Sequence, residues 1–341
     1  MIQPFVDSTG IQHDSAALRA RMQEDGYLYV RGVFPQDVVE ALRLHWLALL
    51  RDAGCVDQDA PLSDGVADLN GFGVEPETHY MKVLVELYRL PQFLALSHHP
   101  NIIDLLGRLL DAPVLPHPRV IPRYIFPQKT EFTTPAHQDW IHIQGTEATY
   151  TAWVPFSDLT EEMGGLQICA GSHRSGVYQF RPALGAGAVE VTDLQSEDWR
   201  YNPVGQGDLI LFHSMIVHQG VPCRGNRLRL SVDTRYQSLH EPVSKTSLTP
   251  HVDAVADWDE IYRDWSHDEP MRYYWQHLPL DIVDPDPSYF ARRGDMAIEM
   301  GEAGDRRALS ALQRIVHRDS DPQRQKQAER LIRQLEAREH Q

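Results

Sequence analysis

The sequence predicts a mainly β protein of the α+β class, with a sandwich or barrel at its centre and flanking helices. Between residues 137 and 237, runs of β-branched and aromatic residues recur at intervals of roughly ten residues, separated by glycine turns. Patterns with helical spacing lie before and after this region. The chain has 341 residues, 42% of them hydrophobic, which suffices for one large core or two modest ones.

The segment before the β-rich centre predicts helices around one strand. A capping residue, Asp14, opens a helix over 14–24, and Asp25-Gly26 ends it. A strand over 27–34 follows, and then a helix from Pro35 to Leu50. Residues 53–76 predict a loop that can act as a lid. Further helices are expected over 80–88 and 100–110, and a strand over 119–126 between prolines.

The β-rich centre and the C-terminal region differ in pattern. Strands are expected over 148–155, 166–169, 209–212 and 227–233, the last alternating with period two. Aromatic residues crowd 254–276, which predicts a helical cap, or alternatively a wall for a substrate. Two helices broken around Ser320-Asp-Pro322 are expected over 303–336. We therefore divide the chain into a main domain, 1–240, and a helical extension packed on or beside it, 241–341.

Composition limits the classes of partner and the compartment. A net charge of −16 argues against nucleic acid and anionic membrane surfaces, which both need a basic patch. The cysteines are widely spaced, with no C-x-x-C pair, so neither a disulfide framework nor a zinc site is indicated. Residues 1–7 lack the pattern of a signal peptide, and no run reaches the roughly 20 apolar residues of a membrane span. We expect a cytoplasmic protein; its oligomeric state is left open.

The chemistry is carried by His137 and Asp139. In a strand, residues two apart share a face, so both side chains can bind one metal ion. His218, directly after the apolar strand 209–212 and a turn, is the third candidate ligand. Two histidines and one carboxylate form the facial triad of non-haem iron(II) oxygenases, which leaves coordination positions open.

Other histidines compete for the metal. In a continuing strand, His142 would face away from Asp139, and His213 has the opposite parity to His218. His173 lies in a predicted turn. Three further histidines lie outside the strand pattern and are expected to be structural or exposed: His117, His240 and His251.

Arg229 is the candidate anchor for an anionic cosubstrate. Its guanidinium can bind a carboxylate through two parallel hydrogen bonds, and Ser231 shares its strand face. Arg224 and Arg227 remain rivals, since Arg227 has the same parity.

Several motifs together resemble the phytanoyl-CoA dioxygenase family. They are His137-Gln-Asp139, Trp153-Val-Pro-Phe-Ser-Asp158, Gly164-Gly-Leu166, Ala170-Gly-Ser-His173, Gly207-Asp208, His218 and Arg229-Leu-Ser231. The resemblance implies a double-stranded β-helix (jelly-roll) core that uses Fe(II), 2-oxoglutarate and O2. It places His137, Asp139 and His218 on the iron. It places Arg229 on the distal carboxylate of 2-oxoglutarate, with Ser231 in support and Trp153 on a strand lining that pocket.

Two positions qualify what the resemblance implies. The family often has Ser or Thr two residues after the distal histidine, where this chain has Gly220, so one cosubstrate contact is replaced or absent. Asp139 argues against halogenation, because halogenating relatives replace this carboxylate with a small residue.

The resulting prediction is a dioxygenase that hydroxylates a small-molecule metabolite or natural-product intermediate and releases succinate and CO2. No separate acid or base residue is assigned. Desaturation, ring closure and demethylation remain alternatives within the class, and a non-catalytic metal- or ligand-binding barrel remains one outside it. Arg123, Tyr124 and Trp140 are the candidates for substrate contact, although Arg123 could instead form a surface ion pair. No basic groove for coenzyme A is evident.

Overall fold

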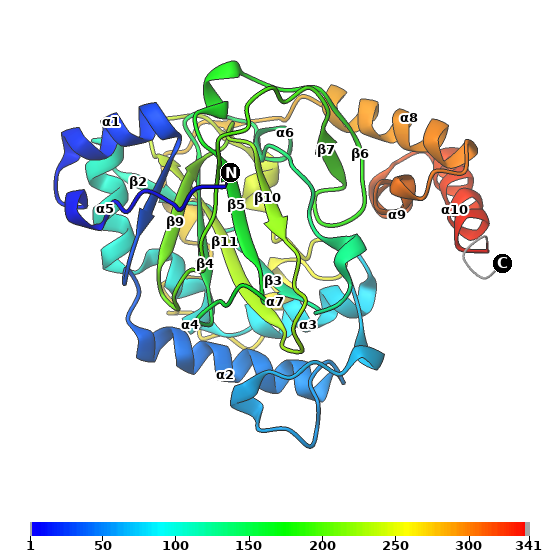
Figure 1. Cartoon of the computed structure of the whole chain (residues 1–341), viewed down its shortest axis with the longest axis horizontal. Helices are drawn as coiled ribbons and strands as arrows, with labels where there is room; N and C mark the ends of the chain where they lie inside the picture. The colour runs from blue at the N-terminus through cyan, green and yellow to red at the C-terminus, as the bar shows by residue number, and fades with distance from the viewer. Residues whose placement is uncertain (1, 338–341) are drawn as a thin grey trace.

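Two antiparallel sheets form the centre of the computed structural model, which describes residues 2–337 (Figure 1). The larger sheet has the strand order β1-β9-β4-β11-β2, and β3 also pairs with β11. Its strands are β1 (Tyr27–Val30), β2 (Val114–Pro116), β3 (Ile121–Ile125), β4 (Tyr150–Pro155), β9 (Leu209–His213) and β11 (Arg229–Ser238). The smaller sheet has the order β10-β5-β8, made of β5 (Gly165–Cys169), β8 (Trp199–Arg200) and β10 (His218–Val221).

The two sheets face each other across a shared apolar layer. Trp153 and Phe212 from the larger sheet pack with Leu166 and Ile168 from the smaller one. On β11 and the residue before it, Leu228, Leu230 and Val232 point to the other face, into the largest hydrophobic core. The period-two alternation of this segment is therefore confirmed, and it turns the intervening polar residues toward the smaller sheet.

Helices from the first third of the chain cover the outer face of the larger sheet. They are α1 (Ser15–Asp25), α2 (Gln36–Asp52), α3 (Thr78–Tyr88), α4 (Pro91–Ala95) and α5 (Pro100–Leu110). The Asp14 side chain accepts hydrogen bonds from the amides of Ala16 and Ala17, which confirms the predicted cap. Between α2 and α3, residues 53–76 form the expected loop, with only two short 3-10 turns, η2 (Leu62–Asp64) and η3 (Leu69–Gly71).

The prediction that residues 137–139 lie in a strand is wrong. His137 forms an isolated bridge with His218, and a short helix, α6 (Trp140–Ile143), begins directly after Asp139. Asp139 already has helical backbone angles, and the Trp140 amide donates to the Ser214 carbonyl. Strand alternation therefore says nothing about the direction of His142.

The aromatic segment 254–276 packs on the main core but is mostly turns rather than a helical cap. It contains only α7 (Trp258–Ile261) and the start of the 3-10 turn η8 (Tyr274–His277), close to a two-stranded parallel pair, β12 (Val243–Ser244) and β13 (Ile282–Val283). Trp258, Tyr262, Trp265 and Trp275 are buried in the same core as the outer face of the larger sheet. Aromatic burial here holds an irregular segment in place.

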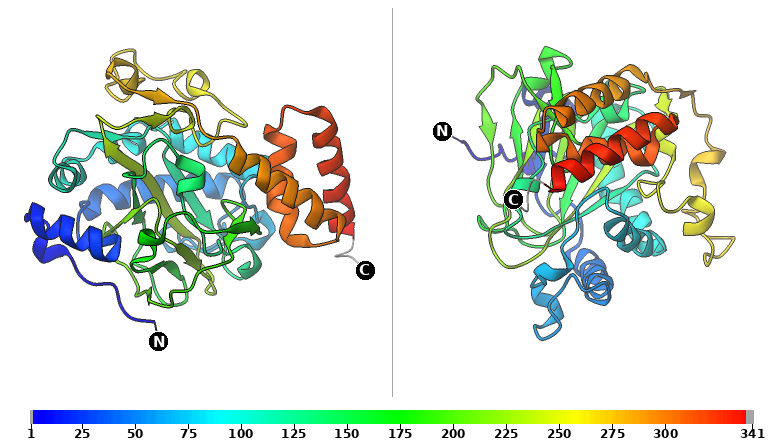
Figure 2. Two further views of the ribbon diagram at one scale, coloured as in Figure 1. Left: turned by 90° about the horizontal axis from the view of Figure 1, so that it is seen from above. Right: turned by 90° about the vertical axis from the view of Figure 1, so that its right-hand side faces the viewer.

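Three helices end the chain: α8 (Ser288–Glu302), α9 (Leu309–Arg318) and α10 (Pro322–Ala337). The predicted break near Pro322 is confirmed, whereas α8 was not predicted. The three helices share a core that includes Leu312 and Leu331 and extends to Leu184 and Ala188. These last two lie in or beside the turn of the hairpin β6 (Phe180–Pro182) and β7 (Val189–Val191), and Figure 2 shows the helices beside the sheets.

The remaining elements are short 3-10 turns: η1 (Thr9–Ile11), η4 (Leu96–His98), η5 (Thr130–Phe132), η6 (Ser172–Ser175), η7 (Lys245–Leu248) and η9 (Arg306–Ala308). Among residues 2–337, no helix has the length and apolar character needed to cross a membrane.

Candidate active site

His137 and His218, far apart in sequence, are brought together by a backbone bridge. Each amide donates to the other residue's carbonyl, at 2.9 Å from His137 and 3.0 Å from His218. The imidazole centroids are 4.2 Å apart, and Asp139 Oδ1 lies 3.8 Å from the Nε2 atom of each ring. The three donor atoms lie within 4.8 Å of one another, and no other such group is found among residues 2–337.

Backbone carbonyls orient both imidazoles. His137 Nδ1 lies 2.8 Å from the Pro135 carbonyl, and His218 Nδ1 lies 3.2 Å from the Ile216 carbonyl. A proton held at Nδ1 leaves the Nε2 lone pair free for a metal. Burial, with the neighbouring His218 ring, lowers the pKa of His137 to about 3, and burial also lowers the pKa of His218. Both rings are therefore neutral near pH 7, as metal ligation requires.

Asp139 is held by two side chains that were not predicted. Its Oδ2 atom accepts hydrogen bonds from Thr151 Oγ1 at 2.7 Å and Arg235 Nη2 at 3.0 Å. Oδ1 is thereby left directed toward the histidines. Burial opposes ionisation, but the charge of Arg235, together with the hydrogen bond from Thr151, outweighs it, so the pKa of Asp139 lies well below its usual range. This set of two neutral imidazoles and one carboxylate fits an iron(II) ion with open positions.

A small cavity adjoins the three candidate ligands. It is lined by Arg123, Ile125, Thr134, His137, Asp139, Trp153, Gly165, Leu166, Phe212, His218, Gly220, Arg229, Ser231 and Asp233. The structure therefore brings the three candidate cosubstrate residues, Trp153, Arg229 and Ser231, to one cavity with the triad.

Arg229 is a buried cation without a carboxylate partner. Its Nη1 atom donates to the carbonyls of Gly165 at 3.2 Å and Val221 at 2.8 Å. The residue is 7% exposed, its Nε atom has no partner, and no carboxylate among residues 2–337 lies within ion-pair distance of it. Burial lowers its pKa. A buried guanidinium in this state is stabilised by an anion from outside the chain.

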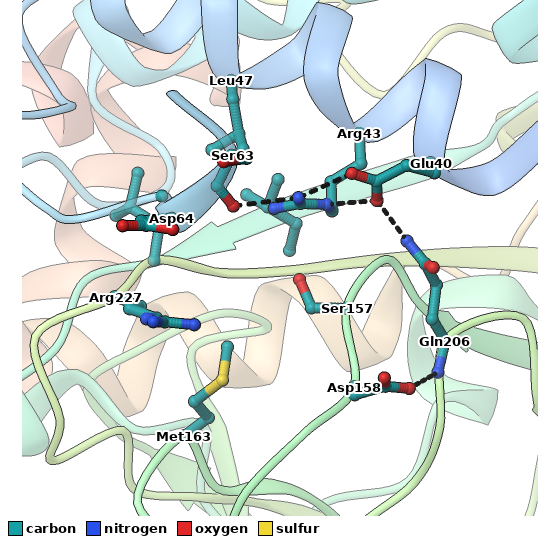
Figure 3. Close-up of a pocket in the computed structure, with 13 residues that line it drawn as sticks. Glu40, Arg43, Leu47, Ser63, Asp64, Ser157, Asp158, Met163, Gln206 and Arg227 are labelled. Atoms are coloured by element: carbon teal, nitrogen blue, oxygen red, sulfur yellow. Dashed lines mark hydrogen bonds and ion pairs between the residues drawn. The ribbon is translucent and has the colours of Figure 1, made fainter. Parts of the chain in front are cut away.

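The rival arginines lie elsewhere. Figure 3 shows Arg227 in a separate pocket, opposite Ser157 and near Asp64 and Met163. Arg224 is exposed and lines neither pocket. Gly220 does line the cavity of the triad, and a Cβ atom there would meet Thr133 Cγ2 at 3.2 Å and the Thr134 amide at 3.4 Å. A larger residue at 220 would therefore require the Thr133 methyl group and the Thr134 backbone to shift slightly.

The three candidate substrate residues occupy different surroundings. Arg123 lines the cavity, but it forms mostly buried ion pairs with Glu75 and Asp233 rather than a surface pair. Tyr124 stacks on Tyr80, with centroids 4.0 Å apart, and lines a neighbouring pocket. Trp140 is half-buried against a small apolar cluster. Only Arg123 of the three shares the cavity with the triad.

The other histidines have separate positions. His142 Nε2 is buried without a partner, and a Cβ atom at Gly187 would touch both this atom and the His137 ring. His173 and His213 face each other, with ring centroids 5.4 Å apart. His117 pairs with Gln237, and His251 with Glu75. Since none of them belongs to the ligand group, the choice of His137 and His218 agrees with the geometry, although strand parity was the wrong reason for setting His142 aside.

Comparison with known proteins identifies the family. The family model described as phytanoyl-CoA dioxygenase (PhyH) matches residues 22–231. The chain belongs to this family. A 1-deoxypentalenic acid 11-beta-hydroxylase from Streptomyces exfoliatus is 26% identical over 275 residues, covering 75% of this chain and 93% of that protein. The corresponding protein from Streptomyces arenae is 26% identical over 269 residues, or 74% and 92% of the two chains.

The solved structures are less similar to this chain in sequence. The non-haem α-ketoglutarate-dependent epimerase SnoN from nogalamycin biosynthesis has a TM-score of 0.48 and 19% identity, covering 69% of this chain and 86% of that one. Family membership and the His-Asp-His group together make this PhyH-family protein an Fe(II)- and 2-oxoglutarate-dependent dioxygenase.

Proposed function

We propose that this enzyme hydroxylates a small natural-product intermediate on a double-stranded β-helix core formed by the two facing sheets. His137, Asp139 and His218 would hold Fe(II), and Arg229, with Ser231 and Trp153, would hold 2-oxoglutarate. The observation that carries the proposal is the buried guanidinium of Arg229, which has no carboxylate partner among residues 2–337 and lies in the same cavity as the three candidate ligands. The two Streptomyces relatives, both described as hydroxylases of a small organic acid, support the substrate class.

The bound iron supplies the oxidising chemistry, in which O2 and 2-oxoglutarate convert a substrate C–H bond to C–OH with release of succinate and CO2. The chain's own residues do the positioning. The neutral imidazoles and Asp139 fix the metal, and Arg229 sets the direction in which the dicarboxylate lies. Apolar residues of the cavity, including Leu166 and Phe212, exclude water from the space between them.

The test begins with anaerobic protein, Fe(II) and 2-oxoglutarate. We expect a weak visible charge-transfer band that depends on both additions. Oxygen is then admitted with a panel of small organic acids that begins with 1-deoxypentalenic acid, and succinate and oxidised product are measured together. A product that gains one oxygen atom supports hydroxylation, whereas a product that loses two hydrogens shows desaturation or ring closure. Absence of the band in wild-type protein would overturn the proposal.

A further inference from the structure

Arg314, on α9, lies outside the family match, which ends at residue 231. Its side chain is 9% exposed, and its Nη2 atom lies 2.9 Å from Glu75 Oε1. Glu75 belongs to the loop between α2 and α3, and it is itself 6% exposed. A helix near the C-terminus therefore makes a buried ion pair with a loop from the first quarter of the chain.

The ion pair continues to the cavity of the metal ligands. The second Glu75 oxygen, Oε2, accepts a hydrogen bond from Arg123 Nη1 at 2.9 Å. Arg123 Nε then donates to Asp233 Oδ2 at 3.0 Å. Arg123 and Asp233 both line the cavity that holds His137, Asp139 and His218. We call the four residues Glu75, Arg123, Asp233 and Arg314 the charged wall.

The charges of the wall balance only when Arg314 is included. Glu75 and Asp233 supply two carboxylates, and Arg123 and Arg314 supply two guanidinium groups. His251 Nε2 lies 3.4 Å from Glu75, but burial lowers the pKa of His251 to about 4, so this ring adds no charge near pH 7. Removing one member of a buried ion network leaves an uncompensated charge, which the remaining members accommodate by moving or by binding a proton.

We propose that Arg314 is a positioning residue for the substrate side of the active site. Acting through Glu75, it fixes the Arg123 guanidinium at the cavity wall. In this way α9 supports the substrate site without lining it. Arg314 does not line the cavity itself, so it acts through the residues that do. The inference rests on the proposed function for the identity of this cavity as the place where substrate binds.

Arg318 provides a matched control on the same helix. One turn beyond Arg314, it pairs with Asp253 at 2.8 Å, and its side chain is 43% exposed. Neither partner lines the cavity of the triad. Arg314→Gln and Arg318→Gln thus remove the same charge from α9, but only the first change reaches the charged wall.

Hydrogen exchange measured by mass spectrometry on the full chain tests the proposal. In Arg314→Gln we expect exchange at least about tenfold faster over residues 72–77 and 121–125, because the pairing that orders them is lost. Exchange within α8 and α10 should stay unchanged. Arg318→Gln should leave 72–77 and 121–125 as in the wild type, and Arg314→Lys, which restores a cation, should recover most of the protection.

Binding and kinetics separate positioning from a general loss of structure. The affinity of the anaerobic Fe(II) protein for 2-oxoglutarate should change by less than about twofold in Arg314→Gln, since Arg229 and the triad are untouched. The KM for 1-deoxypentalenic acid, or for the acid of the panel that is turned over, should rise about ten- to a hundredfold with a smaller change in kcat.

Two results would overturn the proposal: unchanged exchange over 121–125 in Arg314→Gln, or a loss of 2-oxoglutarate affinity as large as the rise in KM. Failure of the proposed function is seen separately, because wild-type protein would then form no charge-transfer band.

Discussion

The metal side of the cavity and the charged wall are built by different kinds of contact. On the metal side, His137 and Asp139 are two residues apart, and Arg229, Ser231 and Arg235 share one face of β11. His218 is joined to His137 by a backbone bridge. The charged wall joins residues 75, 123, 233 and 314, with no shared element or spacing. The metal side therefore depends mainly on short spacings and one backbone bridge, whereas the charged wall depends on side-chain pairings between distant parts of the chain.

The largest effect is expected from Asp139→Ala. It removes the anionic ligand and leaves the Arg235 guanidinium buried beside the two histidines, where its positive charge repels a metal cation. We expect loss of the Fe(II)·2-oxoglutarate absorption band and of succinate formation. His142→Ala is the matched control, because His142 is adjacent but outside the ligand group. Retention of the band in Asp139→Ala would contradict the assignment of Asp139 as an iron ligand on this side of the cavity.

A second comparison uses two arginines of the same predicted parity. Arg229→Gln should weaken 2-oxoglutarate binding about a hundredfold, since a charge-assisted contact in a buried site is lost. Arg227→Gln should bind 2-oxoglutarate as the wild type does, because Arg227 is exposed in a separate pocket. Titration of the anaerobic iron protein, followed by its absorption band, measures both. Equal effects would mean that the cosubstrate does not reach Arg229.

Arg235→Gln tests the support of the metal ligand. Because Arg235 fixes Asp139 Oδ2, we expect its loss to lower Fe(II) affinity about ten- to a hundredfold. Competition with a chelating indicator under anaerobic conditions gives the affinity directly. The Fe(II) affinity of Arg235→Lys should lie between those of the wild type and Arg235→Gln, since lysine keeps the charge but not the guanidinium geometry. An unchanged affinity would show that Thr151 alone holds the carboxylate.

The sequence could predict what depends on local pattern. Helices α2, α3 and α5 and the strands β4, β5, β9 and β11 follow from apolar periodicity and turn residues, and all lie near their predicted positions. The three candidate ligands and Arg229 follow from residue chemistry, together with a resemblance spread over several motifs. Arg235 could have been found by extending the alternation of Arg229 and Ser231 by two further steps along the strand.

The rest could not be predicted because it depends on contacts between distant segments. The helix α6 begins where the Trp140 amide donates a hydrogen bond to the Ser214 carbonyl, and no local sequence pattern predicts this contact. The sequence around Arg123 does not distinguish it from a surface arginine, because its partners Glu75 and Asp233 come from distant segments. The predicted helical cap over 254–276 is wrong because burial of its aromatic side chains in the main core holds an irregular backbone, and this burial depends on distant segments.

Acidification gives the smallest predicted effect and acts on the charged wall. Burial lowers the pKa of His251 from its ordinary value of 6.5 to about 4. Between pH 6.5 and about pH 4, His251 therefore binds a proton in the unfolded chain but not in the folded protein. The free energy of unfolding falls as the pH falls through this window. Burial raises the pKa of Asp233, and this group acts in the opposite direction.

His251→Gln isolates this contribution. Between about pH 7 and pH 5, the metal-free variant should lose about 2 kcal/mol less unfolding free energy than the metal-free wild type. Urea unfolding at the two pH values measures the difference, and the absence of metal keeps the titration of His137 and His218 the same in both proteins. Parallel pH dependence in the two proteins would place the acid sensitivity in other buried histidines, such as His117, and outside the charged wall.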